Sequence, residues 1–466
     1  MSRPRTLGPV GAAADAVAKG LVSAELLVSR SVERIEALNG DLNAVSTLDI
    51  EGAMNDANSF DRDQRGGALA GLPLLVKDTE DAAGLATTFA SMLYQHAGPA
   101  QRDSAAVSAL RGAGSIVLGK ANCSEYAWEG HSWNQLNGAS RNPWDLERSP
   151  GGSSGGSAAA ISSGMVPLAT ATDAGGSVRT PAAQCGLLGL KPSNGLWTCG
   201  EVPGALDQLT PGILASHPSD LELIFNVMSN SPMKSPAWTA FVPVLRVELR
   251  RRLVGTDELD QAVADAWAAL EAPLSELASV IGATFDVVEA PIFADSQLDE
   301  DAFTSFALDL RSFLGRDIIA QNSADLDPSI VHAMAAVESM ELDDYLELRR
   351  RRLNFRDLAD SALESTLVVT PTLTVAGIHA DGSMVGMTTI SDSLPQSVTN
   401  TNMHNWTGHP ALSVPAGFLT TGHPFGIQFT LTRWQDRQLL NLAQLWYEIH
   451  PWPMSAPGFA PFWSIE

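Results

Sequence analysis

The residues that could carry chemistry gather in one Gly/Ser-rich stretch, residues 150–193, with the sequence PGGSSGGSAAAISSGMVPLATATDAGGSVRTPAAQCGLLGLKPS. Two of its serines, Ser153 and Ser177, stand among glycines, whose backbone can turn several N–H groups into one small space. Such a space suits an oxyanion, and a serine beside it can attack a carbonyl if a base accepts its proton. A flexible linker, a phosphate-binding loop and a nucleophile site are the interpretations to compare.

A linker and a phosphate loop both fit poorly. Gly/Ser linkers are flexible because nothing around them is buried, whereas this loop runs at once into Ala158–Ala160, Ile161 and the apolar segment VPLATA. A phosphate loop needs the pattern GxxxxGK[ST], and no lysine follows these glycines. The stretch is therefore predicted to belong to a folded core.

The triplet Gly151, Ser153 and Gly155 satisfies the GxSxG pattern of a nucleophile elbow. That elbow must follow a buried strand and open a helix. The preceding residues, RNPWDLERSP, contain two prolines and cannot form a central strand. The match is a coincidence of composition.

Ser177 lies in a more promising context, because the run DAGGS follows an apolar, strand-like segment. A serine nucleophile needs a base, and none of the nine histidines lies in a recognisable catalytic motif. Lys77 ends the apolar run 72–76. A lysine at that point either extends its amine out to solvent or is held neutral as a base, and both interpretations remain open.

The elements that would position these residues follow a β-α-β rhythm. Residues 23–38 predict a helix with Ser23 as N-cap and Asn39–Gly40 as its stop, and a second helix follows Asp49. A helix over 104–111 precedes a strand over 115–119, which favours parallel strands. The segment WEGHSWNQLNGASRNPWDLERSP predicts a long loop, in which three side chains could line a substrate pocket or simply pack as a lid: Trp128, His131 and Trp133.

Residues 233–365 differ in character, with acidic amphipathic helices around a short strand, ATFDVVEA. Strand patterns return in STLVVTPTL and FGIQFTLT, before a final helix, DRQLLNLAQLWYEIH. The middle segment is predicted to be an inserted helical cap and not a separately folding domain.

Composition limits the partners. The chain has 466 residues and a net charge of −24, which repels nucleic acid and anionic lipid. Three cysteines without a CxxC pair indicate neither a disulfide framework nor a zinc site, and they fit a reduced, cytoplasmic compartment. No signal peptide and no membrane-spanning apolar run are expected.

Taken together, the blocks GGSSGGSAAA, TDAGGSVRTPAA and CGLLGLKPS resemble the amidase signature family. The resemblance includes the spacing of Ser153 and Ser177 (177 − 153 = 24), and it extends to GLPLLVKD around Lys77, TGHPALSVPAG and FGIQF. It covers roughly 20–230 and 365–450, with the middle segment least similar.

The resemblance implies an α/β fold: a central mixed, largely parallel β-sheet covered by helices on both faces, with a helical cap segment. It also implies one domain over 1–466. The parts expected are N-terminal helices over about 1–65, a signature core over about 66–230, the cap over about 233–365 and a return to the core over about 366–466.

The resemblance further implies a Ser-cisSer-Lys triad, with Ser177 as nucleophile, Ser153 as the bridging serine after a cis peptide from Gly152, and Lys77 as base. Burial should lower the pKa of Lys77. The oxyanion would be held by four backbone N–H groups, those of Ala174, Gly175, Gly176 and Ser177. Asp173 and Arg179 are expected to brace the turn and Ser154 to support the Gly/Ser loop. No metal and no organic cofactor are implied.

The expected function is hydrolysis of C–N bonds in small or aryl amides, with esters and carbamates (urethanes) as plausible substrates. The expected partner is a small molecule, with no nucleic acid and no membrane, and the expected assembly is a monomer or homodimer. The alternative is the glutamine-hydrolysing subunit of a tRNA-dependent amidotransferase, which would need partner subunits. A non-catalytic binding protein is a third, weaker hypothesis because the whole triad is present.

Overall fold

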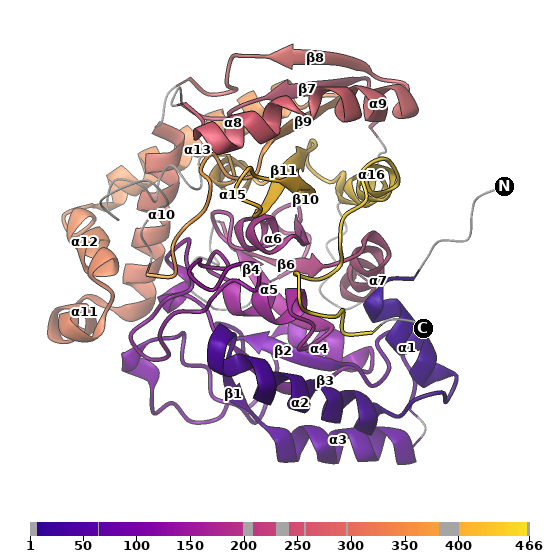
Figure 1. Cartoon of the computed structure of the whole chain (residues 1–466). Coiled ribbons are helices and arrows are strands. Elements are labelled where there is room, and N and C mark those ends of the chain that lie inside the picture. Colours follow the sequence, from indigo (N-terminus) through magenta and orange to yellow (C-terminus); the bar gives the residue numbers. More distant parts are fainter. Residues whose placement is uncertain are drawn as a thin grey trace.

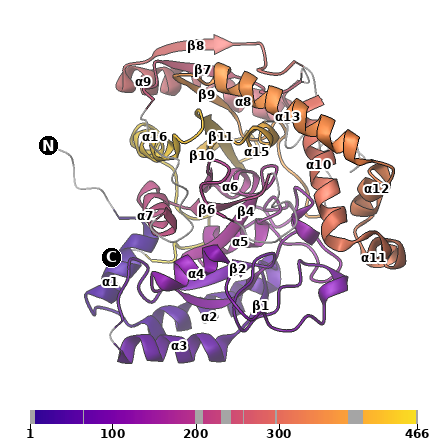
Figure 2. The same ribbon diagram turned by 180° about the vertical axis from the view of Figure 1, so that it is seen from behind.

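The computed structural model describes residues 7–63, 65–198, 208–229, 242–255, 258–294, 297–381 and 400–463. These residues form one 11-stranded sheet with helices against both faces (Figures 1 and 2). The strand order is β1-β3-β2-β4-β6-β5-β10-β11-β9-β7-β8. The strands are β1 (Val45–Leu48), β2 (Pro73–Lys77), β3 (Ile116–Ala121), β4 (Leu168–Asp173), β5 (Leu188–Lys191), β6 (Thr210–Ala215), β7 (Arg246–Arg250), β8 (Thr284–Val288), β9 (Thr366–Pro371), β10 (Ala411–Phe418) and β11 (Pro424–Thr430).

The helices alternate with strands in the first part of the chain and dominate the segment before β9. They are α1 (Pro9–Ala18), α2 (Ala24–Leu42), α3 (Ile50–Arg62), α4 (Ala105–Gly112), α5 (Gly155–Ser162), α6 (Arg179–Cys185), α7 (Pro218–Ser229), α8 (Gln261–Ala268), α9 (Glu271–Ile281), α10 (Gln297–Leu314), α11 (Arg316–Gln321), α12 (Pro328–Ala336), α13 (Leu342–Ala362), α15 (Asn402–Thr407) and α16 (Asp436–Ile449). Three short 3₁₀ turns are η1 (Met92–Tyr94), η2 (Glu125–Ala127) and η3 (Ser323–Asp325).

The α/β class and the mixed sheet are as expected, but the expectation of a largely parallel sheet is wrong. Parallel pairings join β3, β2 and β4, and again β9, β7 and β8. Every pairing from β4 across to β9 is antiparallel, as is β1 with β3. The β-α-β rhythm around 104–119 holds only locally. The connection from β10 to β11 is too short for a crossover helix, so these strands must pair antiparallel.

Two apolar cores lie on opposite faces of the sheet. The larger one joins β-strand side chains to α1, α4, α7, α8, α9 and α16, and the second joins β1, β2 and β3 to α2, α3 and α5. Side chains alternate along β2 accordingly, because Leu74 and Val76 enter the first core and Leu75 the second. Lys77 continues this alternation on the side of Leu75, where α5 begins.

The segment 233–365 contributes more than helices. Its strands β7 and β8 extend the sheet beyond β9, while α10, α11 and α12 project to one side of the molecule (Figures 1 and 2). Part of the segment, residues 233–241, lies outside the described residues. The division of the chain into domains stays a prediction.

The helix expected over 23–38 has the predicted N-cap, Ser23, but it does not stop at Asn39–Gly40. It continues to Leu42, which is buried, and ends at Asn43 in the left-handed conformation. Asn39 instead exchanges two hydrogen bonds of 2.9 Å with the backbone of Val45, which fixes the start of β1. The asparagine that looked like a helix stop therefore joins α2 to the sheet.

Candidate active site

Lys77 is the last residue of β2 and has no solvent exposure. Its Nζ donates to Ser153 Oγ at 2.6 Å and to Thr172 Oγ1 at 2.9 Å, with the Thr172 carbonyl at 3.5 Å. Thr172 lies on β4, the parallel neighbour of β2. Because carboxyl ends of parallel strands meet at one edge of a sheet, the lysine and the loop after β4 are brought together there.

Burial determines the protonation of this lysine. Loss of hydration lowers the pKa of Lys77 to about 8, against the opposing charges of Cys123, Glu80 and Asp173. The amine does not extend to solvent, so the interpretation of a snorkelling lysine is wrong. The shift has the direction that a lysine base requires.

Ser153 follows a cis peptide bond from Gly152 and is fully buried. Ser132 holds this turn, since its Oγ donates to the carbonyls of Gly151 at 2.9 Å and Ser153 at 3.2 Å and accepts from Gly155 N at 3.0 Å. A Cβ on Gly152 would lie 2.5 Å from the backbone N of His131. The long loop 128–150 is therefore packed directly against the Gly/Ser turn, and only glycine fits at position 152.

Ser177 lies in the turn between β4 and α6 and is 8% exposed. Its carbonyl accepts from Ser154 N at 3.3 Å, so the two serine loops are joined through their backbones. The Ser154 hydroxyl donates to the Thr172 carbonyl at 3.3 Å. No described residue forms a hydrogen bond with Ser177 Oγ, and that includes Ser153.

Asp173 organises the turn that carries Ser177. Its carboxylate accepts from the backbone N–H of Gly176 at 2.8 Å and of Val178 at 3.1 Å. The Gly176 N–H is therefore directed at Asp173, which removes Gly176 from the expected oxyanion set. The N–H groups of Ala174, Gly175 and Ser177 form no hydrogen bond with any described residue.

Arg179 holds Asp173 in place through a buried, bidentate ion pair of 2.9 and 2.8 Å. Burial disfavours the ionised carboxyl, but the guanidinium overcomes this cost and keeps the pKa of Asp173 below its ordinary value. The remaining Arg179 donors reach α15 and β11, at the Thr401 carbonyl (2.7 Å), His404 Nδ1 (2.9 Å), Asn405 Oδ1 (2.6 Å) and Gln428 Oε1 (2.8 Å).

The three expected pocket residues have different surroundings. Trp128 stacks on Phe306 of α10, with ring centroids 5.2 Å apart, and both pack with Ala174 and Leu209. His131 is buried behind Gly152 with its Nδ1 4.0 Å from Glu129, and burial lowers its pKa. Trp133 is half-buried and makes no hydrogen bond or ring contact with a described residue. Only Trp128 contacts the turn that carries Ser177.

Sequence reasoning missed Thr172, Ser132 and Phe306. The polar alternation of TATD after Lys77's neighbouring strand could have indicated Thr172 as a strand partner. Nothing in the sequence joins Trp128 to Phe306, because the two are far apart in the chain and meet only in the folded protein.

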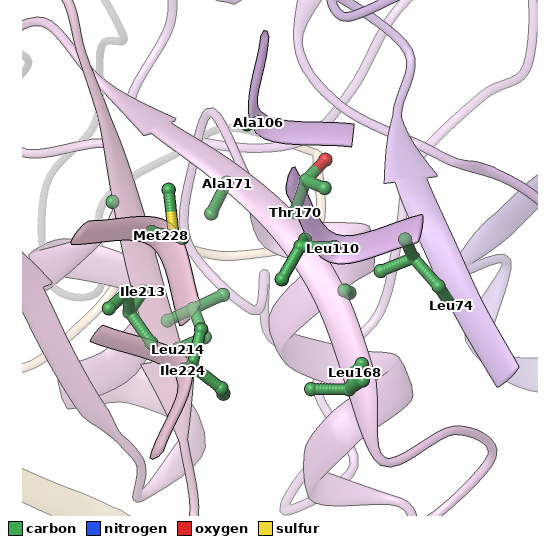
Figure 3. A pocket seen from close by; sticks show the side chains of 12 residues that line it. Leu74, Ala106, Leu110, Leu168, Thr170, Ala171, Ile213, Leu214, Ile224 and Met228 are labelled. Carbon is green, nitrogen blue, oxygen red and sulfur yellow. The ribbon is translucent and has the colours of Figure 1, made fainter. Parts of the chain in front are cut away.

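A small cavity lies elsewhere, between β2, β4 and β6 and the helices α4 and α7 (Figure 3). Its volume is about 10 Å³, and apolar side chains such as Leu74, Leu168 and Met228 line it. A space of this size holds at most one water molecule. It is a packing gap on the face away from α5 and not a substrate site.

Cys123 and Cys185 are buried free thiols, and Cys199 lies outside the described residues. Across the part of the chain that the structure describes, no three His, Cys, Asp or Glu side chains are grouped so as to hold a metal ion. In the same residues no helix has the length and apolar character needed to cross a bilayer.

A family model described as Amidase matches residues 26–440. A glutamyl-tRNA(Gln) amidotransferase subunit of Chromohalobacter salexigens is 31% identical, over 94% of this chain and 96% of that protein. Among solved structures, a bacterial aryl acylamidase of the amidase signature family superposes with a TM-score of 0.83 and 25% identity, over 94% of this chain and 95% of that chain. A 6-aminohexanoate cyclic dimer hydrolase does so with a TM-score of 0.83 and 25% identity, over 97% and 98%.

Proposed function

This chain belongs to the amidase signature family, and on that basis we propose that it is a serine-dependent hydrolase of amide C–N bonds. Small and aryl amides are the main substrates, and esters and carbamates react at the same site. The observation that carries the proposal is the 2.6 Å hydrogen bond from a buried, low-pKa lysine, Lys77, to Ser153 beside the Ser177 turn.

The mechanism uses two serines and one lysine. Neutral Lys77 accepts the proton of Ser153 while Ser153 accepts that of Ser177, whose Oγ then attacks the amide carbonyl. The carbonyl oxygen becomes an oxyanion that the N–H groups of Ala174, Gly175 and Ser177 receive. Ser153 returns a proton to the leaving amine, and water then hydrolyses the acyl-enzyme by the same proton path. The contact between Ser153 and Ser177 tightens when substrate binds, as catalytic hydrogen bonds commonly do.

Asp173 and Arg179 act by holding the turn. Asp173 fixes the backbone on either side of Ser177 through Gly176 and Val178. This directs the serine hydroxyl and the neighbouring N–H groups to the same side. No metal or organic cofactor takes part in this scheme.

The decisive experiment compares Ser177→Ala and Lys77→Ala with wild type on p-nitroanilide, ester and carbamate substrates. Each variant is expected to lose at least about a thousandfold in kcat/KM, because removing a nucleophile or its base leaves only binding and oxyanion stabilisation. Ser163→Ala, whose hydroxyl donates to Ala159 at the end of α5, is the matched control. Undiminished turnover in either triad variant would exclude the mechanism.

A second candidate is the glutamine-hydrolysing subunit of a tRNA-dependent amidotransferase. The 31% identity to an amidotransferase subunit, over 94% of this chain, favours it. The net charge of −24 opposes close approach to tRNA, and the aryl acylamidase superposes on nearly the whole chain. Purification from the native host separates the two functions, since a component of an amidotransferase copurifies with its partner proteins and hydrolyses glutamine. The free amidase is expected to elute as a monomer or homodimer in size-exclusion chromatography with light scattering.

A further inference from the structure

Helix α10 faces the turn that carries Ser177. Asp299 in its first turn and Phe306 two turns later are seven positions apart, so they lie on one side of the helix. Gln208 Nε2 donates to the Ala302 carbonyl at 2.6 Å, which attaches the middle of this side to the core. Figures 1 and 2 show α10 beside α15, and the two helices are in contact.

Asp299 is 8% exposed, and only one of its carboxyl oxygens has a partner among the described residues. Oδ1 accepts from Asn402 Nδ2 at 3.1 Å, and Oδ2 accepts from none of the described residues. Asn402 in turn lies against the expected oxyanion turn, because a Cβ on Gly175 would be 3.5 Å from Asn402 Oδ1. The neighbouring Thr401 Oγ1 donates to the Gly175 carbonyl at 2.6 Å. A half-satisfied carboxyl thus stands one side chain away from that turn.

The same side of α10 supplies an apolar surface. Phe306 stacks on Trp128 at an interplanar angle of 19°, and the pair packs with Leu209 and Ala174. Ala174 is three residues before Ser177. The polar group of Asp299 and the flat rings therefore flank one turn from two directions.

A buried carboxyl with a free oxygen is costly unless a ligand satisfies it. Burial raises the pKa of Asp299 to about 7, the hydrogen bond from Asn402 opposes this shift, and the charge of Glu300 adds to it. A ligand that brings a hydrogen-bond donor, above all an ammonium group, would stabilise the ionised carboxyl.

We propose that α10 is the recognition surface of the active site: Asp299 Oδ2 accepts a hydrogen bond from an amino or hydroxyl group of the substrate, and the Trp128–Phe306 pair receives its apolar part. This inference rests on the proposed amide hydrolysis and narrows its substrate class to amides that carry both an apolar chain or ring and a donor group.

The test uses ω-aminoacyl p-nitroanilides of increasing chain length, each paired with the acyl isostere that has a methyl group in place of the ammonium. A second series carries the amino group on the amine half. Binding to Ser177→Ala by calorimetry gives a readout that does not depend on turnover, and kcat/KM in the wild-type background gives a second. Asp299→Asn is compared with Glu300→Gln, which removes the same charge from the next, exposed position of α10.

At least one amino ligand is expected to bind more tightly than its isostere, because Asp299 receives its ammonium group. Asp299→Asn is expected to reduce that preference about tenfold to a hundredfold, the range of a charged hydrogen bond. Glu300→Gln should leave it unchanged. Equal binding of amino ligands and isosteres throughout, or a preference that Asp299→Asn leaves intact, would overturn the inference.

Failure of the proposed function has a different signature: wild type hydrolyses none of the compounds while the binding preference and its loss in Asp299→Asn persist. If Asp299→Asn does not fold, Phe306→Leu tests the apolar half of the surface. It should lower the preference for aryl over alkyl amides, whereas Phe313→Leu, on the same helix and stacked edge-on with Phe89, should not. An unchanged aryl preference in Phe306→Leu would contradict the proposal.

Discussion

Two buried lysines stand side by side at the edge of the sheet, Lys77 on β2 and Lys120 on β3. Lys120 has a carboxylate partner, Asp78 Oδ1 at 3.6 Å, and donates to the Glu80 carbonyl at 2.5 Å. Lys77 donates only to hydroxyl and carbonyl oxygens. An ammonium without a paired carboxylate loses its proton more easily, so the surroundings distinguish Lys77 as the base.

The pKa of Lys77 predicts the pH dependence of the reaction. Because the base must be neutral, kcat/KM should be low below the folded-state pKa and rise with pH to a plateau, with an apparent pKa of about 8. A profile measured on a neutral anilide checks this value, since the substrate itself does not titrate. A bell centred well below neutrality would show that Lys77 is not the group that titrates.

Thr172 tunes that pKa, because its Oγ1 accepts a 2.9 Å hydrogen bond from the Lys77 amine and favours the charged form. Thr172→Val, which keeps the shape of the side chain, should move the rise of the pH–rate profile down by about one pH unit, the equivalent of one hydrogen bond to a charged group. Thr79→Val is the control, because its buried hydroxyl has no partner among the described residues. Parallel shifts in both variants would argue against a specific contact.

At the scale of elements, the glycines of GGSSGGS permit close packing and not flexibility. The first turn of α5 packs directly against the connections of β1 and β3, where a Cβ on Gly156 would collide with the Asn122 carbonyl and lie 2.5 Å from that of Ala44. Gly156 N also donates to the Asn122 carbonyl at 3.1 Å. The helix that follows Ser153 is thus positioned by backbone against backbone.

Gly156→Ala is therefore expected to lower the free energy of unfolding by about 1–3 kcal/mol, the usual cost of overpacking, and to reduce kcat/KM by displacing Ser153. Denaturant unfolding together with kinetics measures both effects.

Gly40→Ala is the matched control. Gly40 lies exposed inside α2 with no atom within 4 Å of an added Cβ. This substitution should raise the free energy of unfolding by about 0.5–1 kcal/mol through helix propensity and leave kinetics unchanged. Destabilisation at Gly40, or none at Gly156, would contradict the packing argument.

At the scale of the whole molecule, Arg179 joins parts of the chain that are far apart in sequence. It connects the β4 turn through Asp173, helix α15 through Thr401, His404 and Asn405, and strand β11 through Gln428. Burial lowers the pKa of His404 well below its ordinary value, so the imidazole is neutral and its Nδ1 accepts from Arg179. The C-terminal return of the chain therefore fixes the turn of the nucleophile.

Arg179→Met leaves Asp173 as an unpaired buried carboxylate and should cost about 3–5 kcal/mol of stability, with a lower melting temperature. The double variant Asp173→Asn/Arg179→Met removes the stranded charge and should recover part of this loss. Thermal and denaturant unfolding of the single and double variants measure the difference. Equal loss in both would mean that Arg179 acts by packing and not by charge.

Much of the fold class could be predicted from sequence, because strands and helices follow from local periodicity. The helix after Asp49, the helix before β3 and the strands β2, β9 and β11 all appear where the patterns indicate. Strand direction could not be predicted in the same way. The antiparallel centre of the sheet depends on which strands become neighbours, as β5 does with β10, and these two lie more than two hundred residues apart.

The sequence by itself determined the residues around which the site is built. Lys77, Ser153 and Ser177 lie in short motifs whose glycines and apolar neighbours restrict the local backbone, and Lys77 and Ser153 are in hydrogen-bond contact. Only the tertiary structure decided that Gly176 donates to Asp173 and that α10 brings Asp299 and Phe306 to the turn. These features depend on contacts between distant segments, which local patterns do not encode.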